Sequence, residues 1–458
     1  MAGLAVLAKE MGYKVSGCDM KFYPPMSHQL KFNEIYCIEG FEVANLNVEP
    51  DLWIVGNVAT RGMPIVEKLI SEKKKFMSGP EFLSKNILID RPVIAVAGTH
   101  GKTTVTSIIA WLLECAGMNP GFLIGGVPQN FGISARIGQT SSPFVIEADE
   151  YDTAFFDKRS KFLHYAADYV VLNNLEFDHA DIFDNLDDIK KQFHHWIRTL
   201  SKNAVIYSNY SSNILNDLLK EGTWSDVKYF NKRSHISLDW SANKNTSCFE
   251  IFKGEKRLGL VNSPLTGEHN ASNFLGSFGI ASEFGLNFKN AVAYFQQFKG
   301  VKRRLELVAN VSGIKVYDDF AHHPTAIRKT IEGLTGTPQK NLAKIETKRL
   351  IVVFEPRSNS LKLGVGKQQL YDSFEHAHMV YVYNGSIKWD IKSVLNELGE
   401  KVYIDNNLEN ILEKLLSEVK IGDDVVFMSN GDFQGILPTF VKIGKPDHKE
   451  STAVVCAL

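Results

Sequence analysis

Short apolar runs recur along the chain, and each is typical of a strand buried on both faces of a sheet. Between these runs the apolar residues repeat at helical spacing, most clearly over 105–116 and 189–200. Strands that alternate with helices predict an α/β fold with mostly parallel sheets. The predicted strands are residues 51–57, 93–97, 144–147, 169–172, 314–317, 350–354 and 379–383.

The pattern of the first residues is typical of a segment that normally follows an earlier strand of the same domain. Residues 1–11 form an amphipathic pattern closed by Gly12, and a short strand over 13–15 is expected to lead to Asp19. In a dinucleotide-type fold such a helix follows a strand and a glycine-rich turn, with an acidic residue about 20 positions later. The helix and the acid are present here. We therefore expect a Rossmann-like domain whose first strand and glycine-rich turn are missing before Met1.

The length of the chain, 458 residues, predicts about three domains at roughly 150 residues each. Arg91-Pro92 interrupts the apolar pattern, and a new buried strand follows it. We place the domains at 1–90, 91–300 and 301–458. The fold class is then three α/β units: a Rossmann-like domain, a central P-loop ATPase-type domain and a C-terminal Rossmann-like domain.

Charge and composition exclude several kinds of protein. Lys+Arg total 51 against 52 for Asp+Glu, so a broad nucleic-acid surface is not expected. No apolar stretch approaches the ~20 residues of a membrane helix, and no leader is evident. The odd number of widely spaced cysteines predicts reduced thiols in the cytoplasm, without a disulfide framework or a cysteine zinc site; they are Cys18, Cys37, Cys115, Cys248 and Cys456. We favour a cytoplasmic monomer without a nucleic-acid or membrane partner.

A glycine-rich turn joins the strand over 93–97 to the helix that follows it. Strand, turn and helix N-terminus together make a cradle for an anion, because backbone N–H groups and the helix dipole converge there. Lys102 is expected to reach the β- and γ-phosphates of ATP, and the Thr103 hydroxyl to bind Mg²⁺. The usual longer motif is not met, since Val96 stands where its first glycine would be. The predicted ATP-binding residues of the turn are Gly98, Thr99, His100, Gly101, Lys102, Thr103 and Thr104.

This shortened turn resembles that of the Mur ligase family, the ATP-dependent amide-forming enzymes of peptidoglycan assembly. Five further segments resemble the family in the expected order, and the resemblance covers essentially the whole chain: 144–150, 173–179, 267–273, 300–306 and 318–324. Longer passages at 147–161, 177–183 and 354–359 are most similar to the members that act in peptidoglycan recycling. Those members join UDP-N-acetylmuramate to L-alanyl-γ-D-glutamyl-meso-diaminopimelate.

Three alternatives stay open. A ligase that adds L-alanine to the same nucleotide shares the turn and the Asp-His pair. A more distant folate–polyglutamate relative is disfavoured by the residues at 147–152 and 173–179. A nucleotide-binding protein without turnover is the third.

The resemblance implies two magnesium sites. Glu147 ends a strand, supplies the hard oxygen that Mg²⁺ prefers, and is assigned to the first ion with Thr103. His179 is assigned to a second ion that bridges the γ-phosphate and the acceptor carboxylate. Each has a structural alternative: Glu147 as a helix cap or ion-pair partner, His179 as a structural histidine. His194 and His195 are expected to be packing or surface residues.

The resemblance also implies contacts to the nucleotide outside the turn. His269, Asn270 and Asn273 match such contacts, and the spacing puts the two asparagines on one helix face. Arg304 matches an arginine at the ATP phosphates, and Asp318 a residue of the third domain that reaches the nucleotide on closure. Asn270 taken alone could be a helix cap, and Lys302–Arg304 a solvated basic cluster. The predicted catalytic residues are Lys102, His179 and Arg304.

Substrate contacts are expected at the carboxyl ends of strands, where α/β sheets bind ligands. Arg357-Ser358-Asn359 follows the strand over 350–354, and an arginine there can hold a peptide carboxylate by two hydrogen bonds. For the UDP-sugar we expect Asp19, Asn57 and Arg61 in the first domain; Asp19 could instead be a turn residue. ATP would phosphorylate the lactyl carboxylate, and the tripeptide amine would then displace phosphate. Lys102 is expected on an exposed loop, so Lys102→Ala should abolish activity and leave the fold.

Overall fold

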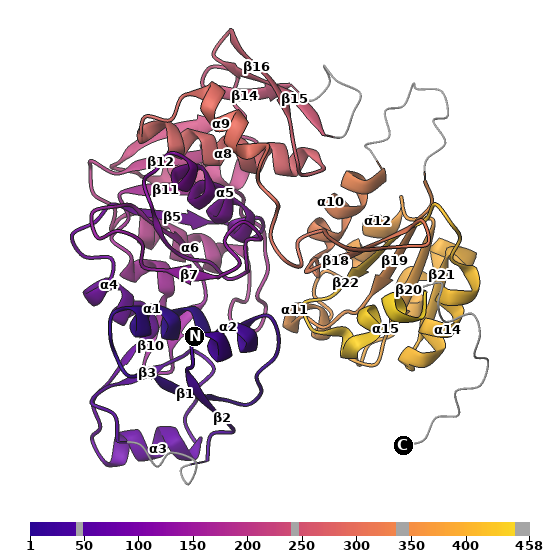
Figure 1. Ribbon diagram of the computed structural model, residues 1–458, viewed down its shortest axis with the longest axis horizontal. Helices are drawn as coiled ribbons and strands as arrows, with labels where there is room; N and C mark the ends of the chain where they lie inside the picture. Colours follow the sequence, from indigo (N-terminus) through magenta and orange to yellow (C-terminus); the bar gives the residue numbers. More distant parts are fainter. Residues whose placement is uncertain (43–48, 240–246, 336–347, 445–458) are drawn as a thin grey trace.

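The computed structural model describes residues 1–42, 49–239, 247–335 and 348–444 (Figure 1). The α/β class predicted from the sequence is confirmed: one ten-stranded and one six-stranded sheet, both mostly parallel, are joined by helices, and two smaller parallel pairs lie in the N-terminal region. The C-terminal unit, orange to yellow in Figure 1, lies beside a block that the other two regions form together. None of the helices in the described ranges is long and apolar enough to cross a membrane.

The N-terminal region carries short strands and four helices. Strands β1 and β2 pair in parallel, and so do β3 and β4. Helix α1 buries Leu4 and Leu7 in one hydrophobic cluster with Ala135 and Phe144 of the central region. The elements are α1 (Ala2–Glu10), β1 (Ser16–Asp19), α2 (Met26–Phe32), β2 (Tyr36–Glu39), β3 (Trp53–Val55), α3 (Pro64–Ser71), β4 (Phe76–Ser78) and α4 (Gly79–Asn86).

One predicted strand in this region is wrong. Residues 13–15 do not form a strand; β1 begins at Ser16. Gly12 has φ +91° and the Tyr13 N–H donates to the Ala8 carbonyl at 3.1 Å, so Tyr13 still belongs to the turn that closes α1. Gly12 therefore ends the helix as predicted, and the chain extends only after it.

The central region is built on the ten-stranded sheet, in the order β16-β15-β14-β13-β12-β11-β5-β8-β6-β7. Strand β5 is buried along its whole length, with Val93, Ala95 and Ala97 in one core cluster and Ile94 and Val96 in the other. Helices therefore cover both faces of the sheet, as a run of small and branched apolar residues predicts.

The strands of the central region are β5 (Val93–Ala97), β6 (Gly121–Leu123), β7 (Ala135–Arg136), β8 (Phe144–Glu147), β9 (Asp152–Ala154), β10 (Asp157–Ser160), β11 (Tyr169–Leu172), β12 (Val205–Asn209), β13 (Asp226–Phe230), β14 (Ile236–Asp239), β15 (Cys248–Lys253) and β16 (Lys256–Asn262). The helices are α5 (Lys102–Cys115), η2 (Lys161–His164), α6 (Leu186–Ile197), α7 (Asn213–Glu221), α8 (Glu268–Glu283) and α9 (Phe288–Phe295). Helix α6 begins three residues before the predicted pattern, because the Asn185 side chain accepts the Asp188 N–H and fixes the first turn.

The C-terminal region is a six-stranded sheet in the order β17-β18-β22-β19-β20-β21, antiparallel only at β17. Its strands are β17 (Glu306–Val311), β18 (Ile314–Asp319), β19 (Leu350–Phe354), β20 (Met379–Tyr383), β21 (Val402–Asp405) and β22 (Asp424–Met428). Its helices are α10 (Pro324–Thr335), α11 (Asn359–Lys362), η3 (Lys367–Gln369), α12 (Leu370–Phe374), α13 (Ile391–Leu395), η4 (Asn396–Lys401), α14 (Leu408–Glu418), η5 (Phe433–Gly435) and α15 (Ile436–Ile443).

The described cysteines carry free thiols; they are Cys18, Cys37, Cys115 and Cys248. Cys456 lies outside the described residues.

Candidate active site

A cavity of about 620 Å³ lies where the three regions meet. The N-terminal region contributes Asn57, the central region the turn Thr99–Thr104, and the C-terminal region the segment Asp319–His323. The cavity is therefore bordered by all three regions. Further polar residues of its lining are Glu147, Asp149, Tyr151, Lys161, Asp178, His179, His269, Asn270, Asn273, Arg304 and Lys329.

The turn after β5 has a shape that only glycine allows at two positions. Gly98 has φ +143° and Gly101 has φ +81°. A Cβ atom at Gly98 would lie 2.9 Å from the carbonyl oxygen of Asn174, and one at Gly101 would lie 2.6 Å from Nδ2 of Asn173. The two glycines let the turn pass close to the loop after β11 and deliver the chain into α5 at Lys102.

Four asparagine side chains hold this turn in place. Asn174 accepts from the His100 N–H at 2.8 Å and donates back to the His100 carbonyl at 2.9 Å. Asn173 Nδ2 bridges the same carbonyl, at 3.1 Å, and Oδ1 of Asn273, at 3.0 Å. Asn273 in turn donates to Asn270 at 3.1 Å. Asn270 and Asn273 thus share one face of α8, as predicted, and that face reaches the turn.

Lys102 is not on an exposed loop, and that expectation is corrected here. It is the first residue of α5, its side chain is 14% exposed, and its Nζ lies 2.7 Å from the Gly98 carbonyl oxygen and 3.0 Å from Glu150 Oε2. Burial opposes the charge, but Glu150 and Asp149 outweigh it and raise the pKa of Lys102. The ammonium group is therefore charged and aimed across the turn.

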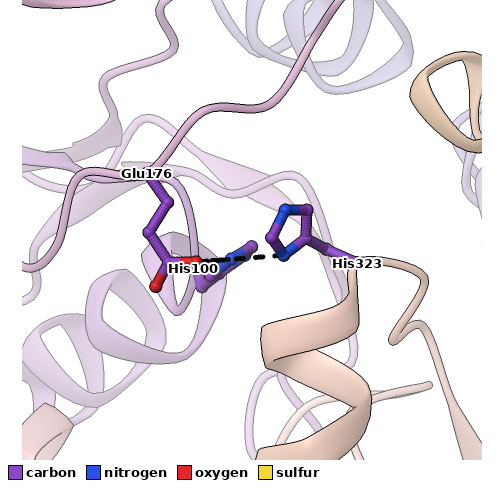
Figure 2. A group of neighbouring side chains, drawn as sticks. All are labelled: His100, Glu176 and His323. Atoms are coloured by element: carbon purple, nitrogen blue, oxygen red, sulfur yellow. Dashed lines mark ion pairs between the residues drawn. The ribbon is translucent and has the colours of Figure 1, made fainter. Parts of the chain in front are cut away.

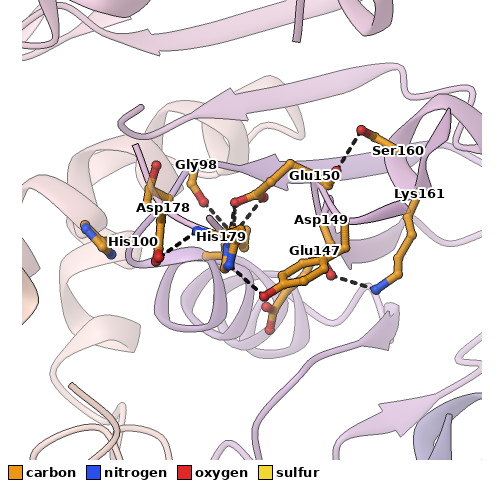
Figure 3. Close-up of polar contacts among 12 residues, drawn as sticks. Gly98, His100, Glu147, Asp149, Glu150, Ser160, Lys161, Asp178 and His179 are labelled. Carbon is orange, nitrogen blue, oxygen red and sulfur yellow. Dashed lines mark hydrogen bonds and ion pairs between the residues drawn. The ribbon is translucent and has the colours of Figure 1, made fainter. Parts of the chain in front are cut away.

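The acidic run after β8 pairs with lysines (Figure 3). Glu150 holds Lys102, Asp149 accepts from Lys161 at 2.8 Å, and Asp152 pairs with Lys158 at 2.6 Å. The first two pairs lie at the cavity, whereas Lys158 is exposed. The sequence left open what these carboxylates do, and Glu150, the partner of Lys102, had no assigned role.

Thr103 and Glu147, which were predicted to bind Mg²⁺ together, lie side by side. The Thr103 hydroxyl lies 3.2 Å from Glu147 Oε2, and the Gly125 N–H donates to Glu147 Oε1 at 2.7 Å. Arg304 Nη2 donates to the Thr103 hydroxyl at 3.2 Å. Burial is the main reason that the pKa of Glu147 is raised, and Gly125, Arg304 and Lys102 offset it only in part. Hydroxyl and carboxylate oxygens are the ligands that Mg²⁺ prefers, and a cation here would favour the charged carboxylate, so the pair fits that ion.

His179 fits a metal less directly. Its Nε2 lies 3.2 Å from Glu150 and its Nδ1 lies 2.6 Å from the Tyr151 hydroxyl, so both ring nitrogens already face protein groups (Figure 3). Burial lowers the pKa of His179, but Glu150 and Asp178 more than offset it and the net direction is upward. The residue has φ +59°, and Asp178 accepts its N–H at 2.7 Å. A metal at Nε2 requires the ring to part from Glu150.

Of the other residues predicted to contact the nucleotide, some line the cavity and one does not. His269 lines it, and burial lowers the pKa of His269 to about 3, so its ring is neutral. Asp318 lies outside the lining, 3.4 Å from Arg303, and burial raises the pKa of Asp318 to about 6. Its neighbour Asp319 lines the cavity and accepts from Ala321 N–H at 2.7 Å and from the Thr330 hydroxyl at 3.0 Å. Successive residues of a strand point to opposite sides, so the pattern Asp-Asp alone could not tell which one faces in.

The predicted contacts to the UDP-sugar are not gathered in one place. Asn57 lines the cavity, whereas Asp19 and Arg61 are not among its lining residues. Arg61 is exposed and pairs with Glu67 at 2.9 Å. Their roles stay predictions.

The predicted peptide contacts lie at the border between the C-terminal and central regions. Arg357 pairs with Asp432 at 3.1 Å, Ser358 caps α11 and lines a second cavity of about 470 Å³, and Asn359 donates to Asp181 at 2.8 Å. The next residue, Ser360, had no predicted role, yet it donates to Asp178 at 2.8 Å and accepts from the Ala180 N–H at 3.3 Å. These hydrogen bonds join the two regions directly beside His179.

The fold is a set of α/β units around one cavity, and the chain belongs to the Mur ligase family, a family of ligases. Sequence profiles of the family match in order: the "Mur ligase family, catalytic domain" at 1–89, the "Mur ligase middle domain" at 96–281 and the "Mur ligase, glutamate ligase domain" at 303–431.

The chain is also similar to individual proteins, of which two sequences and one crystal structure are compared below. The chain is 42% identical over 441 residues to the UDP-N-acetylmuramate–L-alanyl-γ-D-glutamyl-meso-2,6-diaminoheptandioate ligase of Escherichia coli, covering 95% of this chain and 94% of that protein. The crystal structure of a murein peptide ligase from Psychrobacter arcticus matches with a TM-score of 0.74 and 36% identity, over 99% of this chain and 97% of that one. The UDP-N-acetylmuramate–L-alanine ligase of Syntrophomonas wolfei is 30% identical over 375 residues, 80% of this chain and 76% of that protein.

Proposed function

We propose that this protein uses ATP to join UDP-N-acetylmuramate to L-alanyl-γ-D-glutamyl-meso-diaminopimelate, as in peptidoglycan recycling. One observation carries the proposal: a single cavity is lined by the phosphate turn, by the Thr103–Glu147 pair and by residues of all three regions. The identity of 42% to a tripeptide ligase over nearly the whole chain, against 30% over a shorter part to an L-alanine ligase, supports the tripeptide as acceptor.

The chemistry requires a leaving group on a carboxylate. An oxygen of the lactyl carboxylate attacks the γ-phosphorus of ATP, ADP leaves, and an acyl phosphate results. The amine of the tripeptide then attacks the carbonyl carbon, the C–O bond to phosphate breaks, and the amide forms. Phosphoryl transfer depends mainly on positioning and on neutralising charge.

We assign the charge neutralisation to Lys102, whose Nζ donates to the Gly98 carbonyl, and to Arg304, which donates to the Thr103 hydroxyl. The N–H groups of Gly98–Thr104 hold the phosphates, and His269, Asn270 and Asn273 hold the rest of the nucleotide with Asp318 contributing on closure. Thr103 and Glu147 would hold Mg²⁺, which supplies further positive charge at the phosphates when bound. His179 would join a second ion after its ring leaves Glu150.

The substrates would divide among the three regions. We propose 1–90 for the UDP-sugar, through Asp19, Asn57 and Arg61; 91–300 for ATP; and 301–458 for the tripeptide, through Arg357, Ser358 and Asn359. Closure of the third region over the cavity would keep water from the acyl phosphate. We also propose that the enzyme acts in the cytoplasm as a monomer.

The test is acceptor-dependent release of phosphate. With ATP, Mg²⁺ and UDP-N-acetylmuramate, release should need the tripeptide and be negligible with L-alanine. Release with L-alanine alone would contradict the proposal and favour the L-alanine ligase. Calorimetric binding of uridine nucleotide and of ATP without any turnover would instead favour a nucleotide-binding protein.

A further inference from the structure

Two histidines and a glutamate meet between the central and C-terminal regions, outside the Thr103–Glu147 pair. His100 lies in the phosphate turn, Glu176 follows β11, and His323 directly precedes α10 (Figure 2). One ligand atom from each lies within 4.8 Å of the other two. We propose that these three residues form a site for a zinc-class divalent cation that ties the C-terminal region to the phosphate turn.

The separations suit one ion. His100 Nε2 lies 3.5 Å and His323 Nδ1 lies 3.9 Å from Glu176 Oε2. A tetrahedral Zn²⁺ with bonds of about 2.0–2.1 Å holds its ligand atoms about 3.4 Å apart. Closing the set onto an ion therefore requires side-chain shifts of about 1 Å, which rotations of the imidazole and carboxylate groups supply.

One member of this set lacks a hydrogen-bond partner, and the other two hold partners that a cation could replace or join. His100 Nε2 is buried and makes no hydrogen bond, a state that is costly unless something binds it. Within the described ranges, the ion pairs of Glu176 are those with the two histidines, and no lysine or arginine there lies within the same range. His323 Nδ1 accepts a long bond of 3.3 Å from the Thr325 N–H, and a cation at Nδ1 would replace this weak bond. A cation would satisfy all three groups together.

The donor set selects the kind of ion. Two imidazoles and one carboxylate suit Zn²⁺, whereas Mg²⁺ prefers oxygen ligands and keeps several waters. The site is therefore distinct in chemistry from the Thr103–Glu147 pair, which offers oxygens only. Three protein ligands leave a fourth position for water or for a group of a bound substrate.

The position of the site gives it a consequence for the fold. His100 and Glu176 belong to the central region, and the Thr99 hydroxyl ties Glu176 to the turn by a 2.8 Å bond from the Glu176 N–H. His323 belongs to the C-terminal region, whose Thr325 hydroxyl donates to Glu176 at 2.6 Å. Because the ligands come from both sides, occupancy holds the two regions together, and separation of the regions removes one ligand.

The full chain is titrated with ZnCl₂ in a calorimeter, which gives the number of tightly bound zinc ions and their affinity. Excess Mg²⁺ is present so that sites made of oxygen ligands are already filled. His323→Asn and Glu176→Gln each remove one ligand; His322→Asn is the matched control, because the ring of His322 turns to the Phe320 carbonyl instead. Wild type and His322→Asn should bind one equivalent that the two ligand variants bind at least about 100-fold more weakly. Small-angle scattering should show wild type, and not His323→Asn, becoming more compact with zinc.

Equal zinc stoichiometry and affinity in wild type and both ligand variants would overturn the proposal. So would loss of the equivalent in His322→Asn with retention in His323→Asn. Circular dichroism confirms that each variant is folded; if His323→Asn is not, Glu176→Gln, which keeps nearly the same shape, decides the question.

Discussion

The two walls of the large cavity are built differently. The central wall includes the contiguous turn Thr99–Thr104, which asparagine side chains of the same region hold at 2.8–3.1 Å. The opposite wall, Asp319–His323, belongs to the C-terminal region and meets the central one through a few side chains such as Thr325 and Ser360. The turn is thus fixed mainly by its own region, with Arg304 reaching Thr103 from the C-terminal region, whereas the opposite wall depends on how the two regions meet.

Because of this difference, changes at the two walls should affect different kinetic constants. Changes in the central wall should affect ATP and the chemical step, because those groups are fixed before substrates bind. Changes at the domain border should affect the peptide substrate and closure, since few contacts hold the opposite wall. Four predictions test the contrast.

The largest effect is expected at Lys102. Lys102→Met removes the ammonium group at the turn, and turnover should fall about 10³-fold. It also leaves buried Glu150 with His179 as its remaining ion-pair partner, which costs about 3 kcal/mol of stability. The double variant Lys102→Met/Glu150→Gln should recover stability in urea unfolding but no activity. Lys158→Met, which breaks an exposed pair with Asp152, is the control and should change turnover less than about twofold. Near-normal turnover of Lys102→Met would refute the role of the turn.

A second effect concerns pH and Asp318 on the C-terminal side. Burial raises the pKa of this carboxyl to about 6 from its ordinary 3.8, although Arg303 opposes the shift. The folded state therefore binds the proton more tightly, and the stability it gives is full below the unfolded pKa and lost as pH rises through about 6. The loss is about 3 kcal/mol. Urea unfolding at about pH 4, where most of the effect is present, and about pH 7.5 should show wild type falling by about 2 kcal/mol relative to Asp318→Asn. A difference that does not change with pH would contradict the assignment.

A smaller effect is expected at Asn173, which ties the turn to α8. Asn173→Ala should cost about 1–3 kcal/mol of stability and raise the KM for ATP about tenfold, because the His100 carbonyl loses a donor. Asn287→Ala removes the cap of α9, away from the cavity, and should cost about 1 kcal/mol with no change in this KM. The same KM in both variants would show that the asparagines do not shape the ATP site.

The smallest effect is expected at the domain border. Ser360→Ala removes the hydrogen bond to Asp178, and the loss of about 1 kcal/mol should raise the KM for the tripeptide about fivefold while the KM for ATP stays unchanged. Ser417→Ala, whose hydroxyl bonds only within its own helix end, should change neither constant. A rise in the KM for ATP alone would mean that the border serves the nucleotide.

Elements formed by consecutive residues were predicted best from the sequence. The strand over 93–97 and the turn after it lie where they were predicted, and α5 begins at Lys102, three residues before the helical pattern predicted over 105–116. The strand predicted over 13–15 failed because the hydrogen bond from Tyr13 to Ala8 depends on how the helix ends, which composition does not reveal.

Contacts between distant segments could not be read in the same way. Glu150 lies 48 positions from Lys102, and nothing local says that this carboxylate, among its acidic neighbours, is the partner. The inward residue of Asp318-Asp319 depends on the register of β18. His323 and Glu176 become neighbours only when two domains meet, so their spacing in the chain carried no signal.

The most direct test follows one oxygen atom. UDP-N-acetylmuramate labelled with oxygen-18 in the lactyl carboxylate is incubated with ATP, Mg²⁺ and the tripeptide, and the released phosphate is examined by mass spectrometry. The proposed acyl phosphate predicts that each phosphate carries one labelled oxygen and that the UDP product gains the mass of the tripeptide less one water. Unlabelled phosphate, or label released with L-alanine and not with the tripeptide, would contradict it.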